Sequence, residues 1–424
     1  KINMKKALIF IFTIVSIGLV FFLRVLSFRG SLFMIYTLLV TSYLVLIYIL
    51  AYKYKAIPDM GYRPKVSIII PAKNEEDAIK LTINSCLKSD YPPKKLEVIV
   101  IDDGSTDGTY KKMKECEGPR VRVIKHKINK GKRQAIASGI RVAKGEFIVS
   151  IDSDSQIKSD AITLMMQPFV DKNVMAVCGH GNVSNKDKNL LTKIQHAWYQ
   201  EMFYILKSME SQIGAVNCCS GILAAYRREN VLAILDEWLG QNFFGVPIII
   251  SDDRQLTNLS LRGNKNITTK NAKVLYQSNA IVYTAAPDNM KQFLKQQIRW
   301  RRGSLHGTLS ASKFMWEKKA IVSAYFYPYM YLTYLTPFII VRWLFYMPIV
   351  KGEFFAGIAF LSGVLYVGFI HGLNIWRNNN ESENIFYRTI FGFMSLFFTL
   401  IILPYSVLTL HKNGWITRSK GATL

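Results

Sequence analysis

The sequence predicts an α/β protein in which a doubly wound, mainly parallel sheet is inserted between membrane-spanning helices. Short apolar strands alternate with helical segments between residues 66 and 151, and this alternation is typical of parallel sheets. Apolar segments long enough to cross a bilayer lie on both sides of that region. The chain of 424 residues is long enough for one sizeable domain and a membrane portion.

The first two apolar segments, Leu8–Leu26 and Leu32–Tyr52, predict a membrane hairpin. A cleaved signal peptide is the alternative for the first segment, but no convincing small-residue cleavage site follows it. Lysines precede the first segment and follow the second, whereas only Arg24 and Arg29 lie near the connection. The positive-inside rule therefore predicts that both ends of the hairpin face the cytosol.

A linker is expected at Pro58–Pro64, after which the composition becomes globular. The apolar runs predict strands at Val66–Ile70, Leu96–Ile101, Val121–Ile124 and Phe147–Ile151. Helices are expected at Ala78–Leu87, Thr109–Cys116 and Arg133–Val142. Ligands of doubly wound sheets bind at the carboxyl ends of the strands, which is where the acidic motifs of this chain fall.

The last third of the chain returns to the membrane. Asp288–Lys313 mixes apolar and aromatic residues with lysines and arginines, which indicates amphipathic helices at a membrane surface. Three apolar segments follow, near Ile321–Ile349, Phe354–Trp376 and Ile385–Leu410, and Pro404 interrupts the last one.

The charge and cysteine content exclude some classes. Lys and Arg number 54 and Asp and Glu 29, which gives a net charge of +25. Cytoplasmic flanks of membrane helices, anionic lipid head groups and a nucleotide diphosphate all attract such cations. Nucleic-acid binding is not expected, because no motif for it appears. The five cysteines form no CxxC pair, so neither a disulfide framework nor a zinc site is expected and the soluble part fits a reducing cytosol.

Two acidic motifs follow predicted strands. Asp102 and Asp103 can accept hydrogen bonds from a uracil ring and ribose hydroxyls, although a tight turn with capping carboxylates explains them equally well. Asp152 and Asp154 are two residues apart in an extended segment, so both carboxylates can reach one hard cation, Mg²⁺ or Mn²⁺, that diphosphate oxygens also hold. Two buried carboxylates without a cation would be costly, which favours a metal.

Two further motifs carry candidate chemistry. Asn129–Arg133 begins a helix and suits a phosphate, with a solvated basic turn as the alternative. In Ser251-Asp252-Asp253-Arg254, Asp253 is the candidate general base for an acceptor hydroxyl, and Arg254 can orient a carboxylate. The alternative is that Asp252 or Asp253 caps the helix Gln255–Leu261.

The last motifs lie near the membrane segments. Gln296, Arg299 and Trp300 share one helical face, where the indole offers a stacking platform for a sugar ring. A basic-aromatic interfacial helix is the alternative. Trp415-Ile416-Thr417-Arg418 can close over a diphosphate, or it is only a polar tail.

Taken together, these motifs resemble processive membrane glycosyltransferases of family 2, and within that group the bacterial-type hyaluronan synthases and the related chitin-oligosaccharide synthases. The resemblance covers the N-terminal hairpin and about residues 65–418. It rests also on Gly179–Val183, Cys219-Ser220-Gly221, Tyr226-Arg227-Arg228 and Ser251–Asn258. The fold it implies is a cytosolic GT-A-type domain.

The resemblance implies roles for individual residues. Ala72, Glu75 and Asp103, with Asp102, are similar to uridine contacts, and Lys132 and Arg133 to diphosphate contacts. Asp152 and Asp154 are similar to the metal and UDP site, and Asp253, with Asp252 and Arg254, to the catalytic base motif. Gln296, Arg299 and Trp300 resemble the acceptor end of the site and the channel mouth, and Trp415, Thr417 and Arg418 the gating tail.

The resemblance also implies the reaction. An α-linked UDP donor would give a β-linked polymer with inversion, and the membrane helices would export it. We expect a single-chain hyaluronan synthase that uses UDP-GlcNAc and UDP-glucuronate. A chitin-oligosaccharide-type synthase and a glucose/glucuronate capsule synthase remain alternatives. Ser251 stands where hyaluronan synthases usually have glycine, Ile416 replaces a usual glycine, and Ile222 replaces a common proline.

Other classes fit less well. A single-transfer enzyme acting on a polyprenyl phosphate would need neither the Gln296–Trp300 element nor the tail, because it has no channel. A transporter or scaffold would leave the acidic motifs without a purpose.

The expected domains are the transmembrane hairpin (1–57), the cytosolic GT-A domain (58–287), the amphipathic interface helices (288–320), the channel-forming transmembrane or re-entrant helices (321–411) and the gating tail (412–424). The protein is expected in the plasma membrane as a multi-pass protein. Three full spans after the cytosolic domain would put the tail outside, so one segment is expected not to cross. Ile385–Leu410 is the candidate, because Pro404 interrupts it and His411 and Lys412 favour the cytosolic face.

Overall fold

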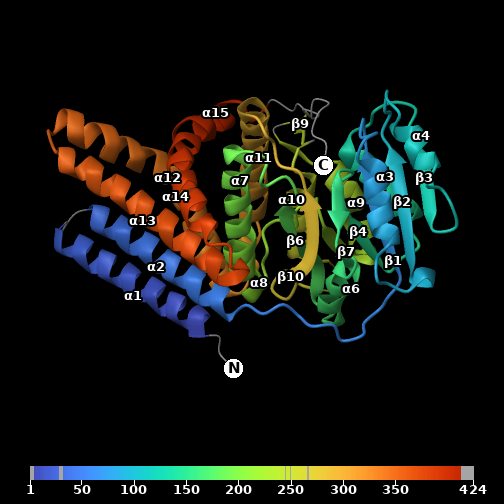
Figure 1. Cartoon of the computed structure of the whole chain (residues 1–424), viewed down its shortest axis with the longest axis horizontal. Helices are drawn as coiled ribbons and strands as arrows, with labels where there is room; N and C mark the ends of the chain where they lie inside the picture. The colour runs from blue at the N-terminus through green and yellow to red at the C-terminus, as the bar shows by residue number, and fades with distance from the viewer. Residues whose placement is uncertain (1–3, 28–31, 244, 249, 265–266, 412–424) are drawn as a thin grey trace.

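The computed structural model describes residues 4–27, 32–243, 245–248, 250–264 and 267–411. It has two parts that lie side by side in Figure 1. A bundle of long helices forms one part, and a sheet covered by helices forms the other. The linker at residues 54–65 connects them as an extended strand of chain along the edge of the sheet domain.

The sheet has eight strands in the order β3-β2-β1-β4-β7-β6-β10-β5. The strands are β1 (Val66–Ala72), β2 (Leu96–Asp102), β3 (Val121–Lys125), β4 (Phe147–Ser150), β5 (Ser155–Ile157), β6 (Val174–Val183), β7 (Ala224–Arg227) and β10 (Lys273–Thr284). The first four in space are parallel, as are β6 and β10. β7 is antiparallel to both of its neighbours, so the sheet is mixed with a parallel half, as the sequence predicted.

Alternating strand residues bury two different cores, one on each face of the sheet. Ile68 and Ile70 pack toward the side of α3 (Ile79–Leu87), α4 (Thr109–Lys114) and α6 (Ala161–Met166). Ile69 packs toward α5 (Lys132–Val142) and α9 (Arg228–Leu239) on the other face. Side chains of adjacent strand residues point to opposite faces, so this apolar run is buried on both sides, as in doubly wound folds.

The remaining elements connect the sheet to the helical bundle. They are α7 (Leu190–Glu201), the π-helix η3 (Met202–Lys207), α8 (Ser208–Gln212), the short strands β8 (Asn242–Phe243) and β9 (Val246–Pro247), α10 (Asp252–Arg262) and α11 (Met290–Ser312). Short 3-10 turns are η1 (Pro93–Lys95), η2 (Gln167–Val170) and η4 (Met315–Glu317). The predicted interface helices are one continuous helix, α11, which Asn289 caps by accepting from the Gln292 amide at 3.0 Å.

Among the described residues, five helical segments are long and apolar enough to cross a membrane: Met4–Phe22, Tyr36–Lys53, Ala320–Val350, Phe354–Asn379 and Glu383–Leu408. They belong to α1 (Met4–Ser27), α2 (Leu32–Lys53), α12 (Ala320–Val341) with η5 (Arg342–Val350), α13 (Phe354–Asn379), and α14 (Glu383–Phe397) with η6 (Phe398–Ile402) and α15 (Leu403–Leu408). Each corresponds to an apolar segment predicted from the sequence.

The fifth segment is arranged unlike the other four. In Figure 1, α1, α2, α12 and α13 extend away from the sheet, whereas α14 rises beside α7 and α15 returns to the sheet domain. At its start Arg388 forms a buried ion pair with Glu201 of α7. At its end Thr409 accepts from Arg302 of α11 at 2.7 Å. The start of the segment therefore contacts α7 and its end contacts α11, two helices that lie between the sheet and the helical bundle.

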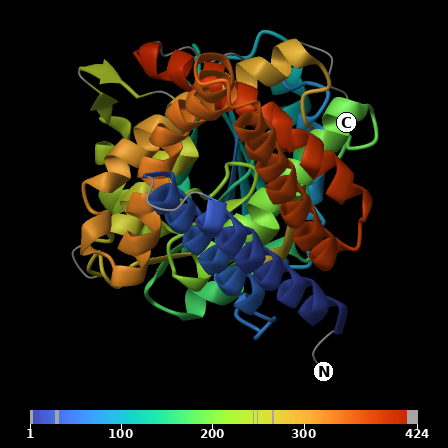
Figure 2. The same ribbon diagram turned by 90° about the vertical axis from the view of Figure 1, so that its left-hand side faces the viewer.

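Glu381, in the turn between α13 and α14, bonds to two basic side chains of the sheet domain and of α7; we call these three residues the Glu381 cluster. Glu381 accepts hydrogen bonds from Lys186 Nζ at 2.7 Å and from His196 Nε2 at 2.8 Å. The hydrogen bond from His196 is the largest influence on the Glu381 carboxyl and, with Lys186, lowers its pKa to about 2. These bonds hold the turn that joins α13 to α14 against the sheet domain, and Figure 2 shows the long helices in front of that domain.

Candidate active site

Lys132 and Asp152 form the centre of the site. Lys132 is the first residue of α5, and Asp152 follows β4. Lys132 Nζ donates to Asp152 Oδ1 at 2.5 Å, and both side chains are partly exposed. Burial alone would lower the pKa of Lys132, but the carboxylates of Asp152, Asp252 and Asp253 raise it above its usual value. A charged amine therefore lies among acidic residues from two motifs that are distant in sequence.

Gly221 joins those two motifs. Its amide donates to Asp253 Oδ2 at 3.2 Å. A Cβ on Gly221 would lie 3.3 Å from both Asp152 Oδ1 and Lys132 Nζ. A side chain here would make a tight contact with the carboxylate and the amine. The predicted base and the predicted metal site therefore face one another across a single glycine, and a small cavity touches Lys132, Gly221 and Asp253.

The backbone around Asp253 fixes its carboxylate. Asp253 Oδ1 accepts from the Arg254 amide at 2.8 Å, and the Thr257 hydroxyl donates to the Asp253 carbonyl at 2.7 Å. The Cys219 amide donates to that same hydroxyl at 2.9 Å. The loop Cys219-Ser220-Gly221 is thus bonded to α10 at two points. The helix N-cap is Ser251 and makes no side-chain cap hydrogen bond, so capping by Asp252 or Asp253 is not what the structure has.

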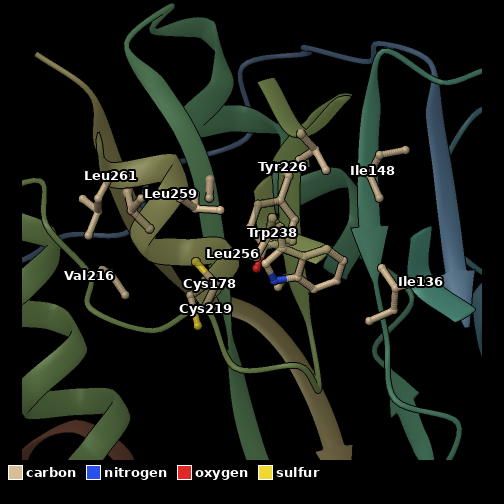
Figure 3. Packing of buried hydrophobic residues seen from close by; sticks show 14 of the residues in the cluster. Ile136, Ile148, Cys178, Val216, Cys219, Tyr226, Trp238, Leu256, Leu259 and Leu261 are labelled. Carbon is tan, nitrogen blue, oxygen red and sulfur yellow. The ribbon is translucent and has the colours of Figure 1, made fainter. Parts of the chain in front are cut away.

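A hydrophobic cluster supports this loop from below. Figure 3 shows Cys178 and Cys219 side by side, next to Leu256 of α10 and the rings of Tyr226 and Trp238. Cys219, Tyr226 and Trp238 are essentially inaccessible to solvent. A packed core of this kind tolerates little change in volume, so the loop that carries Gly221 rests on a rigid base.

Asp252 and Arg133 lie deeper than the sequence suggested. Arg133 Nε is 3.3 Å from Asp252 Oδ1, and both side chains are 7% exposed. Arg133 Nη1 also donates to the Trp238 carbonyl at 2.9 Å. Burial raises the pKa of Asp252, which Lys132 and Arg133 oppose. These bonds give Arg133 a role in positioning the start of α10. Its Nη2 has no hydrogen-bond partner among the described residues, so the expected diphosphate contact stays a prediction.

Asp103 organises the loop before α5. Its carboxylate accepts from the amides of Lys130 and Gly131 at 2.9 and 2.8 Å. His126 Nδ1 lies 2.8 Å from Asp103 Oδ1. His126 was not singled out from the sequence. The one signal for it is that it follows the third strand at the same edge as the acidic motifs.

Asp102 is a better candidate for a ligand contact. It is fully buried, and its Oδ1 accepts from the Ser105 amide at 3.1 Å. Its Oδ2 has no hydrogen-bond partner in the part of the chain that the structure describes. Ala72 lies directly beside Asp102 across the β1–β2 register. Glu75 follows on the next loop, where its amide donates to Thr109 Oγ1 at 2.7 Å. The expected uridine contacts therefore gather at one pair of strand ends.

The helix α11 is packed closely onto α10. A Cβ on Gly303 would lie 2.7 Å from the Cβ of Ser251, whose φ of 64° is left-handed. Arg254 Nη1 donates to Ser304 Oγ at 2.9 Å, and Asn258 Nδ2 donates to the Gly307 carbonyl at 2.8 Å. The element Gln296–Trp300 therefore lies on a helix, α11, that is hydrogen-bonded to α10, the helix that carries Asp253.

Trp300 faces α7. Its ring centroid is 5.8 Å from that of Trp198 and 6.1 Å from that of Tyr199. Gln296 Oε1 is buried without a partner among the described residues, and Arg299 has interactions of its own. Trp415, Thr417 and Arg418, the expected gating tail, lie outside the described residues.

The donor set at Asp152 and Asp154 fits a divalent cation only with help from a substrate. No group of three or more His, Cys, Asp or Glu side chains that could hold a metal occurs in the described ranges. Two partly exposed carboxylates supply hard oxygen ligands, and Mg²⁺ and Mn²⁺ accept phosphate oxygens for the rest. The residues present therefore fit a metal that is shared with a diphosphate.

Lys207 is a functional candidate that the sequence analysis missed. It is a buried lysine in η3, and its amine donates to the Cys218 carbonyl. Burial would lower the pKa of Lys207, but Cys178, Cys218 and Glu210 hold it above its usual value. The lysine supports the chain just before Gly221. A lone lysine in an apolar helix was the only sequence signal.

Comparisons with known proteins show which proteins the chain resembles. The profile for glycosyl transferase family 2 matches residues 67–235, which include Asp102, Lys132, Asp152 and Gly221. The chain is similar to hyaluronan synthase from Streptococcus pyogenes, with 28% identity over 425 residues and 98% of each chain covered. It is similar also to an N-acetylglucosaminyltransferase from Neorhizobium galegae, with 35% identity over 266 residues, which cover 60% of this chain and 58% of the relative.

A solved structure shares the fold. A mannosyltransferase from Pyrobaculum calidifontis, solved in complex with GDP-Man and Mn²⁺, superposes with a TM-score of 0.57 at 20% identity and covers 84% of this chain and 97% of its own. The GT-A-type fold, the glycosyltransferase domain and the resemblance expected from the motifs are therefore confirmed.

Proposed function

We propose that this chain, a family 2 glycosyltransferase related to hyaluronan synthase along its whole length, polymerises UDP-sugars processively at the cytosolic face of a membrane and exports the product. The observation that carries the proposal is the meeting of Asp253, Gly221, Asp152 and Lys132 in one site, directly beside helices of membrane-spanning length. A soluble single-transfer enzyme would not need that neighbourhood.

Asp253 is the proposed base. It would take the proton from the acceptor hydroxyl while that oxygen forms a bond to the anomeric carbon of the donor. The bond between the anomeric carbon and the diphosphate oxygen breaks, and its electron pair leaves with UDP. Attack from the side opposite the leaving group inverts the configuration. The amides of Gly221 and Arg254 hold the two carboxylate oxygens of Asp253 in place for this step.

Asp102, with Ala72 and Glu75, would bind the uridine, and Asp103 would shape the loop that carries Lys132. Lys132 would bind the diphosphate from the start of α5. A divalent cation bound at Asp152 and Asp154 would neutralise charge on the leaving diphosphate. Gln296, Arg299 and Trp300 would line the acceptor end, and Trp415, Thr417 and Arg418 would close over the donor.

The arrangement of α14 and α15 supports a cytosolic tail. Both ends of this segment contact α7 and α11 of the catalytic part, so we propose that the segment stays at the membrane interface and that α1, α2, α12 and α13 cross. Four crossings leave the catalytic part and the tail on the same side. The domain must be cytosolic to meet UDP-sugars.

The proposed polymer is hyaluronan, made from UDP-GlcNAc and UDP-glucuronate. The similarity to a hyaluronan synthase over 98% of both chains supports it. The similarity to N-acetylglucosaminyltransferases supports a polymer of N-acetylglucosamine alone as the second candidate. A glucose/glucuronate polymer is a third, because Ser251 stands where hyaluronan synthases usually have glycine.

A donor-pair assay tests the proposal. Full-length protein purified in detergent with Mg²⁺ or Mn²⁺ is given each UDP-sugar alone and in pairs, and the product is sized and digested with hyaluronidase. Long, hyaluronidase-sensitive product only from UDP-GlcNAc plus UDP-glucuronate is expected. Polymer from UDP-GlcNAc alone would select the second candidate, and polymer from UDP-glucose plus UDP-glucuronate the third. No polymer from any donor would overturn the proposed function.

A further inference from the structure

Arg254 of α10 lies near Arg301 of α11, because Arg254 Nη1 donates to Ser304 Oγ at 2.9 Å and Ser304 is one helical turn from Arg301. Arg301 interacts electrostatically with Arg254 and with Tyr329 and Tyr334 of α12. Two like charges at close range repel each other, and burial lowers the pKa of Arg301. Such a pair is costly unless an anion joins it.

The described residues supply no anion for Arg301. Its guanidinium makes no hydrogen bond or ion pair anywhere in the ranges that the structure describes. Within the described ranges, the guanidinium of Arg254 donates to the neutral Ser304 hydroxyl. The carboxylate that interacts with Arg254 is Glu210, whose Oε1 accepts from Asn217 Nδ2 at 2.8 Å and from the Tyr325 hydroxyl at 3.1 Å.

The pair points away from the donor site. Asp253 faces Gly221, whereas the side chain of Arg254, one position on along the helix, passes beneath Gly307 of α11. Trp300 faces α7, whereas Arg301 faces α10 and α12. The pair therefore lies just beyond the base and the indole, toward the helices that extend into the membrane.

Aromatic rings continue from this point. The rings of Tyr325 and Tyr329 are stacked with centroids 6.0 Å apart, and Tyr43 of α2 stacks on both at 5.7 and 6.3 Å. Tyr325 is buried and its hydroxyl donates to Glu210, whereas Tyr329 is partly exposed and can offer an aromatic face to a sugar ring. Cations followed by tyrosines between α10, α11, α12 and α2 match a chain of sugars that carries carboxylates.

We propose that Arg254 and Arg301 form a binding subsite for the carboxylate of a uronic acid unit in the growing polymer, just beyond the acceptor position. The inference deepens the proposed function, on which it rests, and selects an acidic polymer over one made of neutral sugars alone. A guanidinium pairs with a carboxylate through two parallel hydrogen bonds, which a neutral sugar cannot replace.

Oligosaccharide binding to the full-length protein in detergent tests the subsite. The probes are an alternating N-acetylglucosamine/glucuronate hexasaccharide and the neutral N-acetylglucosamine hexamer. Wild type is expected to bind the acidic probe more tightly, with an affinity that falls as salt rises. Arg301→Gln should weaken the acidic probe by about tenfold or more and leave the neutral probe unchanged. Arg301→Lys should retain part of the preference.

Controls separate the possible sources of the anion. Lys295→Gln removes an exposed charge from the same helix and should leave the preference unchanged. UDP affinity should be unchanged in Arg301→Gln, which also shows that this variant is folded. A parallel loss of UDP affinity would mean that the anion is the donor diphosphate and would overturn the subsite.

The two proposals fail in different ways. Equal binding of both probes by wild type, with polymer still made, would remove the subsite and leave the enzyme activity standing. Binding of the acidic probe that depends on Arg301, in a protein that makes no polymer from any donor, would retain the subsite and remove the proposed function.

Discussion

Gly221 is the residue at which the two halves of the candidate site meet. Its amide bonds to Asp253, and the space where a Cβ would stand is bordered by Asp152 and Lys132. Sequence reasoning found the carboxylates and the lysine, because charged residues at strand ends and at a helix start are visible as motifs. It did not find the reason for the glycine, because that reason is a close approach between segments distant in the chain.

At this scale, Asp253→Asn is expected to retain UDP binding and to lose turnover. An amide keeps the shape of the carboxylate but cannot take the acceptor proton, and a general base contributes about 10²- to 10⁴-fold to rate. UDP affinity by calorimetry and product formation in the donor-pair assay are the measurements. Synthesis near the wild-type rate would remove Asp253 from the base role.

A second residue-scale prediction concerns Arg133. Arg133→Lys keeps a charge but loses the planar contacts with Asp252 and the Trp238 carbonyl. If Arg133 positions α10, kcat should fall while the KM for the donor changes little. A rise in KM with kcat unchanged would instead return Arg133 to the diphosphate, as the sequence first suggested.

At the scale of elements, the packing of α10 on α11 connects the helix of Asp253, the candidate base, to the helix of Gln296–Trp300. The sequence predicted both helices, since their apolar spacing and their start signals are local. The packing between them could not be predicted, because it depends on Gly303 meeting Ser251 in a left-handed conformation, which no local pattern signals.

Gly303→Ala is expected to lower activity, because the added Cβ would lie 2.7 Å from the Cβ of Ser251 and one of the helices must move. Ser251→Gly removes that Cβ, so the double variant Ser251→Gly/Gly303→Ala should recover activity relative to Gly303→Ala. A matched control is Gly18→Ala in α1, where nothing lies within 4 Å of the added Cβ. Additive losses in the double variant would contradict the contact.

The Glu381 cluster gives a pH prediction at the same scale. The pKa of this carboxyl is depressed from 4.5 to about 2, mainly by the hydrogen bond from His196. A depressed carboxyl stabilises the fold above its unfolded pKa, and that contribution is lost as the pH falls from about 4.5 through about 2. Glu381→Gln should therefore lower the melting temperature in detergent near pH 6. The difference from wild type should shrink as the pH falls through that window; a constant difference would contradict the assignment.

At the scale of the whole molecule, the last of the five apolar segments is arranged differently from the other four. Length and hydropathy predict for each of the five described segments that it can cross a membrane, so they do not distinguish one segment from another. The ion pair of Arg388 with Glu201 and the hydrogen bond from Arg302 to Thr409 join the two ends of the last segment to α7 and α11. Pro404 and the charges that follow it pointed to the same segment, but the sequence could not supply these contacts.

Topology mapping tests this arrangement. A reporter fused after Leu424 is expected to read as cytoplasmic. A cysteine at Gly352, in the connection between η5 and α13, should react with a membrane-impermeant reagent from outside the cell, whereas one at Asn380, in the turn beside Glu381, should not. An external reading at the C-terminus, or labelling at 380 from outside, would contradict a segment that stays at the interface.

The sequence by itself determined the fold class, the apolar segments of membrane-spanning length, the acidic motifs and the resemblance to family 2 glycosyltransferases, because periodicity, span length and strand-end motifs are properties of neighbouring residues. Only the tertiary structure showed that Arg133 turns inward, that His126 and Lys207 bond to the segments around the candidate site, that Gly221 lies between Asp253 and Asp152, and that Arg254 lies near Arg301. Those facts depend on which side chains meet across the fold, and distance along the chain carries no information about that.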